Sequence, residues 1–172
     1  MNKPKTILRA LEPEDLEELY AIENDRSIWN VGSTNVPYSR YVLHDYIANA
    51  SSDIFADRQV RLMIVGEKGE NVGVVDVVNF DPRHRRAEIG IVIKQAYRRL
   101  GYGRSAVEAV MGYARDIWHL HQLYVIVDVD NTESVGLFEQ LGFSKSSQLH
   151  SWLYDGHGYR DAMLMQTFLE KK

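Results

Sequence analysis

The feature that most constrains the fold is the stretch 89–114, which runs from a strand into a helix through a basic turn. It begins with the unbroken apolar run Ile89–Ile93, which is typical of a buried strand. The turn Arg98–Gly103 contains two glycines and two arginines. Apolar or small residues then recur at helical spacing, at Ala106, Val107, Val110, Met111 and Ala114. The pattern therefore predicts a strand that leads through a glycine turn into a helix.

This turn has the form of an anion-binding site. The first amides of a helix have no carbonyl partner within it, and the positive end of the helix dipole lies at the same point. Gly101 and Gly103 let the main chain approach a phosphate with no Cβ in between. Arg98, Arg99 and Arg104 add positive charge. The Gly-Lys-Ser/Thr of a Walker loop and the third glycine of a dinucleotide turn are both missing, and a turn that binds nothing is the alternative.

Length and composition bound the class of protein. A chain of 172 residues, 45% hydrophobic and 26% charged, suits one soluble domain, which we expect to span residues 1–172. The absence of cysteine excludes disulfides and a thiolate nucleophile. A net charge of −4 and a pI of 5.9 argue against nucleic-acid binding and are compatible with a cationic substrate. With no apolar run of about 20 residues and no signal peptide, we expect a cytoplasmic protein that does not enter membranes.

The remaining sequence predicts alternating strands and helices. Strands are predicted at 6–11, 59–65, 72–80, 86–93, 122–129, 143–154 and 159–169. Helices are predicted after the start signal 12–15, at 40–49 with Ser39 as its cap, after the glycine turn, and at 132–141 before Gly142. This order indicates an α/β or α+β fold, a mostly antiparallel sheet with helices on both faces. The strand–helix–strand step around the turn implies two parallel neighbours.

Four features in this order resemble the GNAT acetyltransferases. They are the strand 89–93, the turn Arg98-x-x-Gly101-x-Gly103, the strand end Asp128-x-Asp130-Asn131, and the helix ending 139–143, which resembles Tyr-x-x-x-Gly-Phe. Within that superfamily the stretches 84–93, 123–131 and 158–165 resemble the spermidine/diamine N-acetyltransferases. The ribosomal-protein N-terminal acetyltransferases share several of these features.

The resemblance implies a twisted sheet of about seven strands, with the fourth and fifth splayed, and acetyl-CoA as cosubstrate. Pantetheine would add to the open strand edge, and the amides of the turn would bind the pyrophosphate. The implied cosubstrate contacts are Ile91, Val92, Ile93, Arg98, Arg99, Leu100, Gly101, Tyr102, Gly103, Arg104, Ser105, Asn131 and Phe138. For Asn131, capping of the helix that follows is an equal alternative.

The proton donor to the leaving thiolate is the weak point of the resemblance. The polyamine enzymes carry a tyrosine seven residues after the asparagine, where this chain has Phe138, which has no exchangeable proton. Tyr154 or Tyr159 is a candidate donor, with core packing as the alternative. The thiolate can also take a proton from water, since the pKa of the corresponding thiol is about 8.5. This route is the one we favour. A third possibility is a non-catalytic acyl-CoA sensor.

Acids and an aromatic residue are candidates for the acceptor side. Glu88 is the candidate general base, acting through water, and a salt bridge to Arg85 or Arg86 is the alternative. Asp76 lies where the resembled enzymes carry a substrate-side acid, and a solvated strand position is the alternative. Trp29 lines the acceptor pocket or packs in the core.

Two departures from the resembled enzymes bear on partners. The loop 32–38 carries no acid, where the polyamine enzymes have paired acids, so regulatory polyamine binding is in doubt. His84, His119 and His121 lack an ordered ligand spacing, so no metal is expected. We expect an N-acetyltransferase acting on a small primary amine of polyamine or diamine type. Protein N-terminal acetylation is the alternative, and a homo-oligomer is left open.

Overall fold

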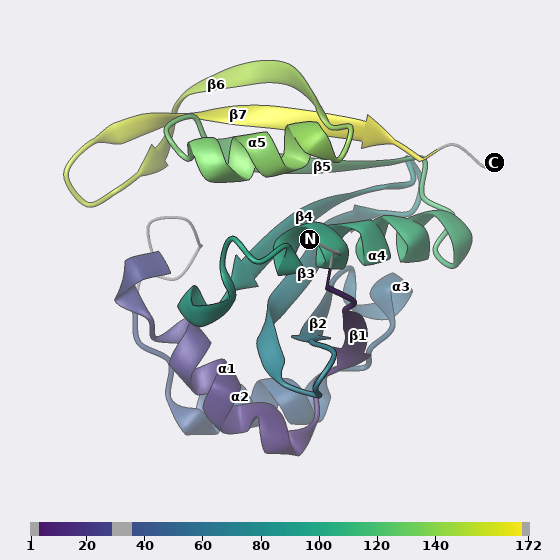
Figure 1. The fold of residues 1–172 in the computed structure, drawn as a ribbon, viewed down its shortest axis with the longest axis vertical. Helices are drawn as coiled ribbons and strands as arrows, with labels where there is room; N and C mark the ends of the chain where they lie inside the picture. Colours follow the sequence, from purple (N-terminus) through teal and green to yellow (C-terminus); the bar gives the residue numbers. More distant parts are fainter. Residues whose placement is uncertain (1–3, 29–35, 170–172) are drawn as a thin grey trace.

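The computed structural model describes residues 4–28 and 36–169, whose strands form one seven-stranded sheet in the order β1-β2-β3-β4-β5-β7-β6 (Figure 1). The strands are β1 (Ile7–Ala10), β2 (Val60–Val65), β3 (Asn71–Asp81), β4 (Arg86–Ile93), β5 (Gln122–Asp128), β6 (Ser144–Tyr154) and β7 (Tyr159–Phe168). The helices are α1 (Leu16–Glu23), α2 (Arg40–Asn49), α3 (Ile54–Asp57), α4 (Tyr102–Asp116) and α5 (Thr132–Gln140). Short 3₁₀ turns are η1 (Pro13–Asp15), η2 (Arg26–Ile28) and η3 (Gln95–Tyr97). The predicted mixed fold is confirmed.

The helix ends follow the capping residues seen in the sequence. The Ser39 hydroxyl accepts a hydrogen bond from Val42 N at 3.1 Å and starts α2 at its predicted residue. At the end of α5, Gly142 adopts a left-handed φ of 85°, and its amide bonds Glu139 O at 3.0 Å. The four-residue helix α3 was not predicted because it is too short to show a period. The Asp53 carboxylate starts it by accepting from Phe55 N at 2.9 Å.

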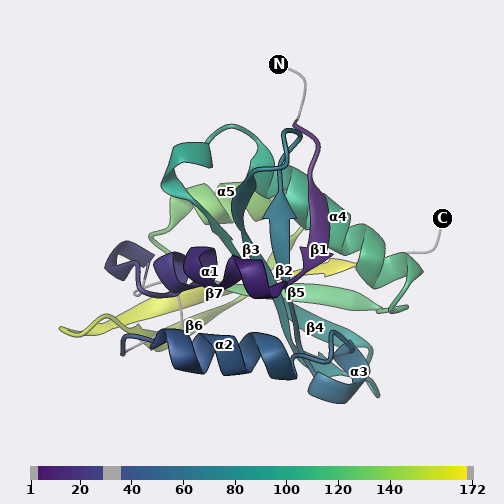
Figure 2. The same ribbon diagram turned by 90° about the horizontal axis from the view of Figure 1, so that it is seen from below.

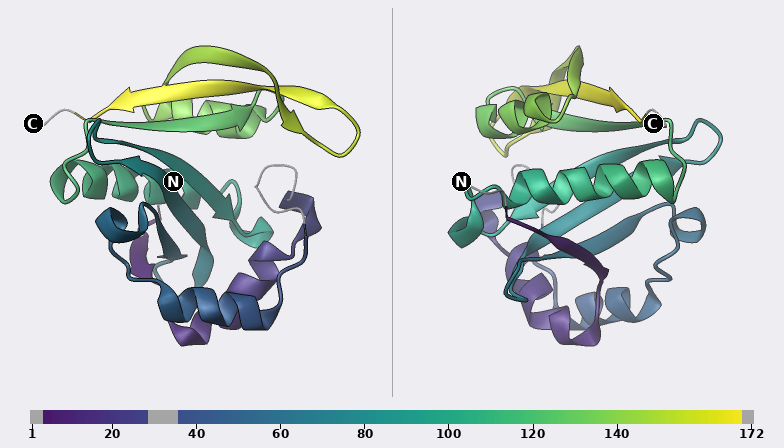
Figure 3. Two further views of the ribbon diagram at one scale, coloured as in Figure 1. Left: turned by 180° about the vertical axis from the view of Figure 1, so that it is seen from behind. Right: turned by 45° about the vertical axis from the view of Figure 1, so that its right-hand side comes forward.

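Helices cover both faces of the sheet. In the larger buried cluster, Val107 and Val110 of α4 and Phe138 of α5 pack with strand residues on one face. On the other face, Ile22 of α1 packs with Met63 and Val74. Figure 2 shows α1 and α2 side by side, and Figure 3 shows α4 lying along β1 at the opposite side of the sheet.

The apolar face of α2 is only partly buried. Leu43 is 3% exposed, whereas Val42 is 49% exposed. Val42, Leu43 and Tyr46 line a cleft, so this face borders open space instead of a closed core.

Strands β4 and β5 separate after a short paired segment. They are parallel neighbours only from Arg86↔Gln122 to Glu88↔Tyr124. Beyond that point β4 continues beside β3 to Ile93, while β5 continues beside β7 to Asp128. Figure 1 shows the two strands diverging. We call the gap between the unpaired segments 89–93 and 125–128 the wedge.

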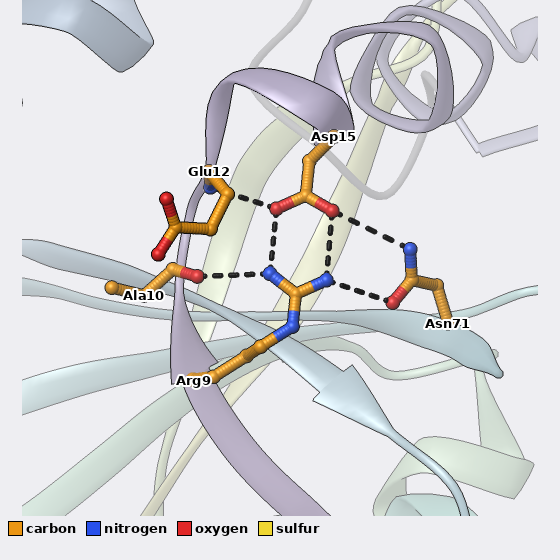
Figure 4. A network of polar contacts seen from close by, with 5 residues as sticks. All are labelled: Arg9, Ala10, Glu12, Asp15 and Asn71. Atoms are coloured by element: carbon orange, nitrogen blue, oxygen red, sulfur yellow. Dashed lines mark hydrogen bonds and ion pairs between the residues drawn. The ribbon is translucent and has the colours of Figure 1, made fainter. Parts of the chain in front are cut away.

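A polar network ties the first strand to the rest of the sheet (Figure 4). The Arg9 guanidinium donates to both oxygens of the buried Asp15 carboxylate, at 2.7 and 2.8 Å, and to Asn71 Oδ1 at 3.1 Å. Asp15 also accepts from the Glu12 amide at 2.8 Å. The hydrogen bonds from Arg9 hold the pKa of Asp15 below its usual value against the opposing effect of burial, and the Glu12 amide adds to this.

This network predicts a pH-dependent loss of stability in Asp15→Asn. We expect the free energy of unfolding at pH 7 to fall by about 3 kcal/mol, because a paired carboxylate is removed beside a guanidinium. A lowered folded-state pKa contributes stability above the unfolded value of about 3.9, and this stability is lost as pH falls through the folded-state pKa. Urea unfolding should therefore show a smaller difference between variant and wild type at pH 3 than at pH 7.

The exposed neighbour Glu14 provides the matched control, since Glu14→Gln makes the same chemical change outside the network. A difference between Asp15→Asn and wild type that is as large at pH 3 as at pH 7 would contradict the ionic role of Asp15.

Candidate active site

A cleft of about 670 Å³ occupies the wedge and extends between β3, α1 and α2. Strand segments 88–92 and 125–128 form two of its walls. Of the residues predicted from the sequence, the cleft brings together Asp76, Glu88, Ile91, Val92, Asn131 and Phe138. The residues predicted for the cosubstrate edge and those predicted for the acceptor side therefore line one continuous space.

The glycine turn lies where the wedge opens. Gly101 has a φ of 90° and precedes α4, whose first turn is closed by Ser105 N to Gly101 O at 3.1 Å. The amides before Ser105 thus have no carbonyl within the helix to bond. A Cβ on Gly103 would lie 3.5 Å from Leu137 of α5 and 3.7 Å from Ile93 of β4. Gly103 therefore sits between the end of β4 and α5.

The three arginines in and beside the turn have protein partners. Arg98 Nε donates to Ile93 O at 2.9 Å, and Arg104 Nε lies 3.1 Å from Glu108 Oε1. Arg99, at a left-handed φ of 61°, pairs with Glu133 in the first turn of α5. The Arg99–Glu133 pair thus connects the turn before α4 to the helix after β5.

Other predicted turn residues are engaged elsewhere. The Ser105 hydroxyl is buried against Thr6 Oγ1 at 2.9 Å, and the Tyr102 hydroxyl donates to Glu70 at 3.1 Å. Leu100 is 57% exposed. Both hydroxyls are thus occupied by protein partners, so the turn offers its main chain and arginines.

Glu88 lies on the cleft wall beside the last paired residues of β4 and β5. Its Oε2 accepts from Asn79 Nδ2 at 2.8 Å. A bulge in β3 gives Asn79 a left-handed φ of 52°. Burial, followed by the Glu88 charge, raises the pKa of Tyr124, which is opposite Glu88 in the β4–β5 register. Neither Asn79 nor Tyr124 could be predicted as a neighbour of Glu88, because both contacts depend on strand register.

Asp76 forms an ion pair. The alternative interpretation of Asp76 as a solvated strand residue is therefore wrong. It makes two contacts with Arg61, the cross-strand partner on β2, and both residues line the cleft. Arg86, offered as a partner for Glu88, lies 3.4 Å from Asp81 instead.

The remaining predicted residues divide between the cleft and other places. Asn131 Oδ1 caps α5 by accepting from Ser134 N at 3.2 Å, and Asn131 also lines the cleft. Phe138 is 2% exposed and packs edge-on against Phe143 at 5.0 Å. Tyr154 is 64% exposed, and its hydroxyl donates to Gly156 O at 3.2 Å. Tyr154 therefore does not face the cleft, and Trp29 lies outside the described residues.

Residues 5–144 match the acetyltransferase (GNAT) domain family. The chain belongs to the GNAT acetyltransferase family. It is 32% identical over 162 residues to the spermidine N(1)-acetyltransferase of Escherichia coli K12. The aligned segment covers 94% of this chain and 84% of that protein. The spermidine N(1)-acetyltransferase of Vibrio cholerae is 28% identical over 172 residues, and the aligned segment covers 99% of this chain and 96% of that protein.

Solved structures agree with this family. Spermidine N-acetyltransferase from Vibrio cholerae in complex with CoA and spermine matches with a TM-score of 0.85 at 25% identity, covering 96% of each chain. A dodecameric structure of the Vibrio cholerae enzyme matches with a TM-score of 0.80 at 27% identity, covering 96% of this chain and 94% of that one. The predicted GNAT family, the splayed strands and the acetyltransferase class are confirmed, and acetyl-CoA is the cosubstrate of this family.

The predicted absence of a membrane interaction and the predicted absence of a metal remain predictions. No helix among residues 4–28 and 36–169 is long and apolar enough to cross a membrane. Within the same residues no group of three or more histidine or acidic side chains is placed to hold a metal ion.

The position of Gly103 predicts a selective loss of CoA binding in Gly103→Glu. The added side chain extends from the α4 end of the wedge between Ile93 and Leu137, where its charge repels a diphosphate. We expect the Kd for CoA, measured by titration calorimetry, to rise by about tenfold or more. Gly112→Glu, in the same helix with open space around its Cβ, is the control and should bind CoA like wild type. Equal affinities in both variants would place the cosubstrate elsewhere.

The Arg99–Glu133 pair predicts the opposite effect in Glu133→Gln. Releasing Arg99 makes its charge available to an anion at the turn, so CoA should bind more tightly. Because the two side chains are 82% and 62% exposed, the gain should be only about two- to fivefold at low ionic strength and should vanish at high salt. Weaker CoA binding in this variant would show that the pair supports the site instead of competing for it.

Proposed function

We propose that this GNAT protein transfers the acetyl group of acetyl-CoA directly to a primary amine of a diamine or polyamine. The observation that carries the proposal is the single cleft that joins the wedge to an acidic acceptor side. Among the described residues, four carboxylates and one arginine line it, namely Glu23, Asp76, Glu88, Asp128 and Arg61. This surplus of negative charge favours a cationic acceptor.

The residues at the wedge fit a CoA thioester. Between Ile89 and Ile93 the β4 edge has no strand beside it on the β5 side, so an amide chain can pair there. Bound acetyl-CoA would supply the activated acetyl group. Ile91, Val92 and Ile93 would hold the pantetheine arm, with Asn131 and Phe138 on the facing side. The turn 98–105 would bind the pyrophosphate through main-chain amides and through Arg98, Arg99 and Arg104.

Glu88 is the proposed general base. An amine acceptor arrives as an ammonium ion and must lose a proton before its nitrogen can attack the thioester carbon. The Glu88 carboxylate, oriented by Asn79, would take that proton through a water molecule. Asp76 would bind positive charge on the acceptor, and Trp29 stays a proposed pocket residue by sequence alone.

The leaving thiolate does not need a tyrosine in this proposal. Phe138 has a ring without a hydroxyl seven residues after Asn131, and the Tyr154 hydroxyl donates to Gly156 O. A thiolate with a pKa of about 8.5 takes a proton from water readily. Orientation of the two reactants then supplies most of the rate enhancement.

The assembly and extent of the protein belong to the same proposal. Because one matched Vibrio cholerae structure is a dodecamer, we propose that this chain also forms a homo-oligomer, with no number of subunits assigned. We also propose that residues 1–172 act as one catalytic domain in the cytoplasm.

The deciding experiment is an acetylation assay read out as thiol release, with spermidine, 1,4-diaminobutane, butylamine and short peptides as acceptors. The proposal requires rapid release with the diamine and spermidine. Release with peptides alone would indicate N-terminal acetylation, and tight CoA binding with no release above the amine-free rate would indicate a sensor. Either result overturns the proposal.

The role of Glu88 predicts a loss of turnover in Glu88→Gln. The variant keeps the hydrogen-bond acceptor for Asn79 but cannot take a proton, so kcat should fall by roughly 10²- to 10⁴-fold. The Kd for CoA should stay unchanged, because Glu88 lies on the acceptor side. Recovery of the rate at high pH, where the amine is already neutral, would support the assignment. A kcat equal to that of wild type at pH 7 would exclude Glu88 as the base.

A further inference from the structure

Three charged side chains from three elements meet on one wall of the cleft. Arg61 of β2 contacts Asp76 of β3 through Nε–Oδ1 at 2.6 Å and Nη2–Oδ2 at 2.9 Å. Its Nη1 pairs with Glu23 at the end of α1. All three line the cleft, and their side chains are only 20%, 24% and 11% exposed for Arg61, Asp76 and Glu23. We call them the triad.

The triad carries a formal charge of −1, because two carboxylates share one guanidinium. Arg61 stays charged. Burial is the largest single influence on its pKa and lowers it, but the hydrogen bonds and charge of Asp76, together with the charge of Glu23, outweigh burial and raise the pKa above its usual value. Without that cation the two carboxylates would repel each other in a partly desolvated site. Arg61 therefore fixes both the position and the charge of the pair.

Among the described residues, the strand position opposite Asp76 carries no side chain. Asp76 is opposite Gly90 in the β3–β4 register, and a Cβ built on Gly90 would meet only Asp76 Cβ, at 3.8 Å. Glu88 lies two residues before Gly90 on the same face of β4, so Asp76 and Glu88 are diagonal neighbours whose Cα atoms lie about 7–8 Å apart. This backbone spacing is of the same order as the length of a short linear diamine.

We propose that the triad binds the non-reacting ammonium group of the acceptor while the reacting amine lies near Glu88. Glu23 is then a further acceptor-binding residue, and Arg61 is a positioning residue that sets the subsite charge to −1. The proposal rests on the proposed function and specifies its substrate class. One extra ammonium at short spacing neutralises the subsite, so a diamine is bound more tightly than a monoamine of the same length.

The test measures binding, so that it does not depend on turnover. Titration calorimetry in the presence of CoA compares 1,4-diaminobutane with butylamine in wild type, Glu23→Gln and Asp76→Asn. Each substitution makes the triad neutral, so each should weaken diamine binding by about tenfold and change butylamine binding by less than about twofold. Glu17→Gln is the control, because Glu17 lies on the same helix but pairs with the exposed Arg40. CoA affinity and melting temperature establish that each variant is folded.

Arg61→Lys tests the positioning role. It keeps the charge but loses the two-pronged contact, so the preference for the diamine should persist while its KM rises and kcat stays the same. If Glu23→Gln weakens both amines equally, or neither, the triad is structural and the proposal is overturned. If the diamine binds through the triad but no amine is acetylated, the triad proposal stands and the proposed function fails.

Discussion

The separation of β4 from β5 is the constraint on which the rest of the structure depends. Each strand keeps its outer partner, β3 or β7, and loses its inner one after Glu88 and Tyr124. Main-chain groups left at such an inner edge must find other partners, since unpaired polar groups are costly once water is excluded. Water can serve in the free protein, and an amide chain can serve in a complex. The first hydrogen-bonding groups of the site are therefore main-chain groups at the strand edges, not side chains.

The sequence predicted the elements of this arrangement but not its side-chain partners. Strand Arg86–Ile93 and helix Arg40–Asn49 were predicted at their observed bounds, because an apolar run and a serine cap are local signals. The role of Asp76 was left open because its partner, Arg61, is distant in sequence and is brought close by strand register. The same holds for Glu23, which meets Arg61 only when α1 packs on the sheet. Tyr154 was considered for the site because Phe138 has no exchangeable proton, and a tyrosine at a hairpin end gives no local sign of the side to which it points.

The two ends of the site carry opposite charge, and this asymmetry is more informative than the net charge of −4. Arginines surround the turn before α4, and carboxylates predominate in the cleft beyond Glu88. In the proposed function, this asymmetry would direct an anionic cosubstrate and a cationic acceptor to different ends and would disfavour each reactant in the place of the other. The Arg99–Glu133 pair moderates the basic end, as Arg61 moderates the acidic end.

Phe138 fits this division. A hydroxyl at that position would have to be satisfied in a nearly buried place, where the ring instead packs against Phe143. The step that needs protein assistance is the loss of a proton from the ammonium ion, whose pKa lies well above neutrality, whereas a thiolate is a good leaving group without help. In the proposed function, Glu88 on the amine side therefore provides the ionisable group where the proton is hardest to move.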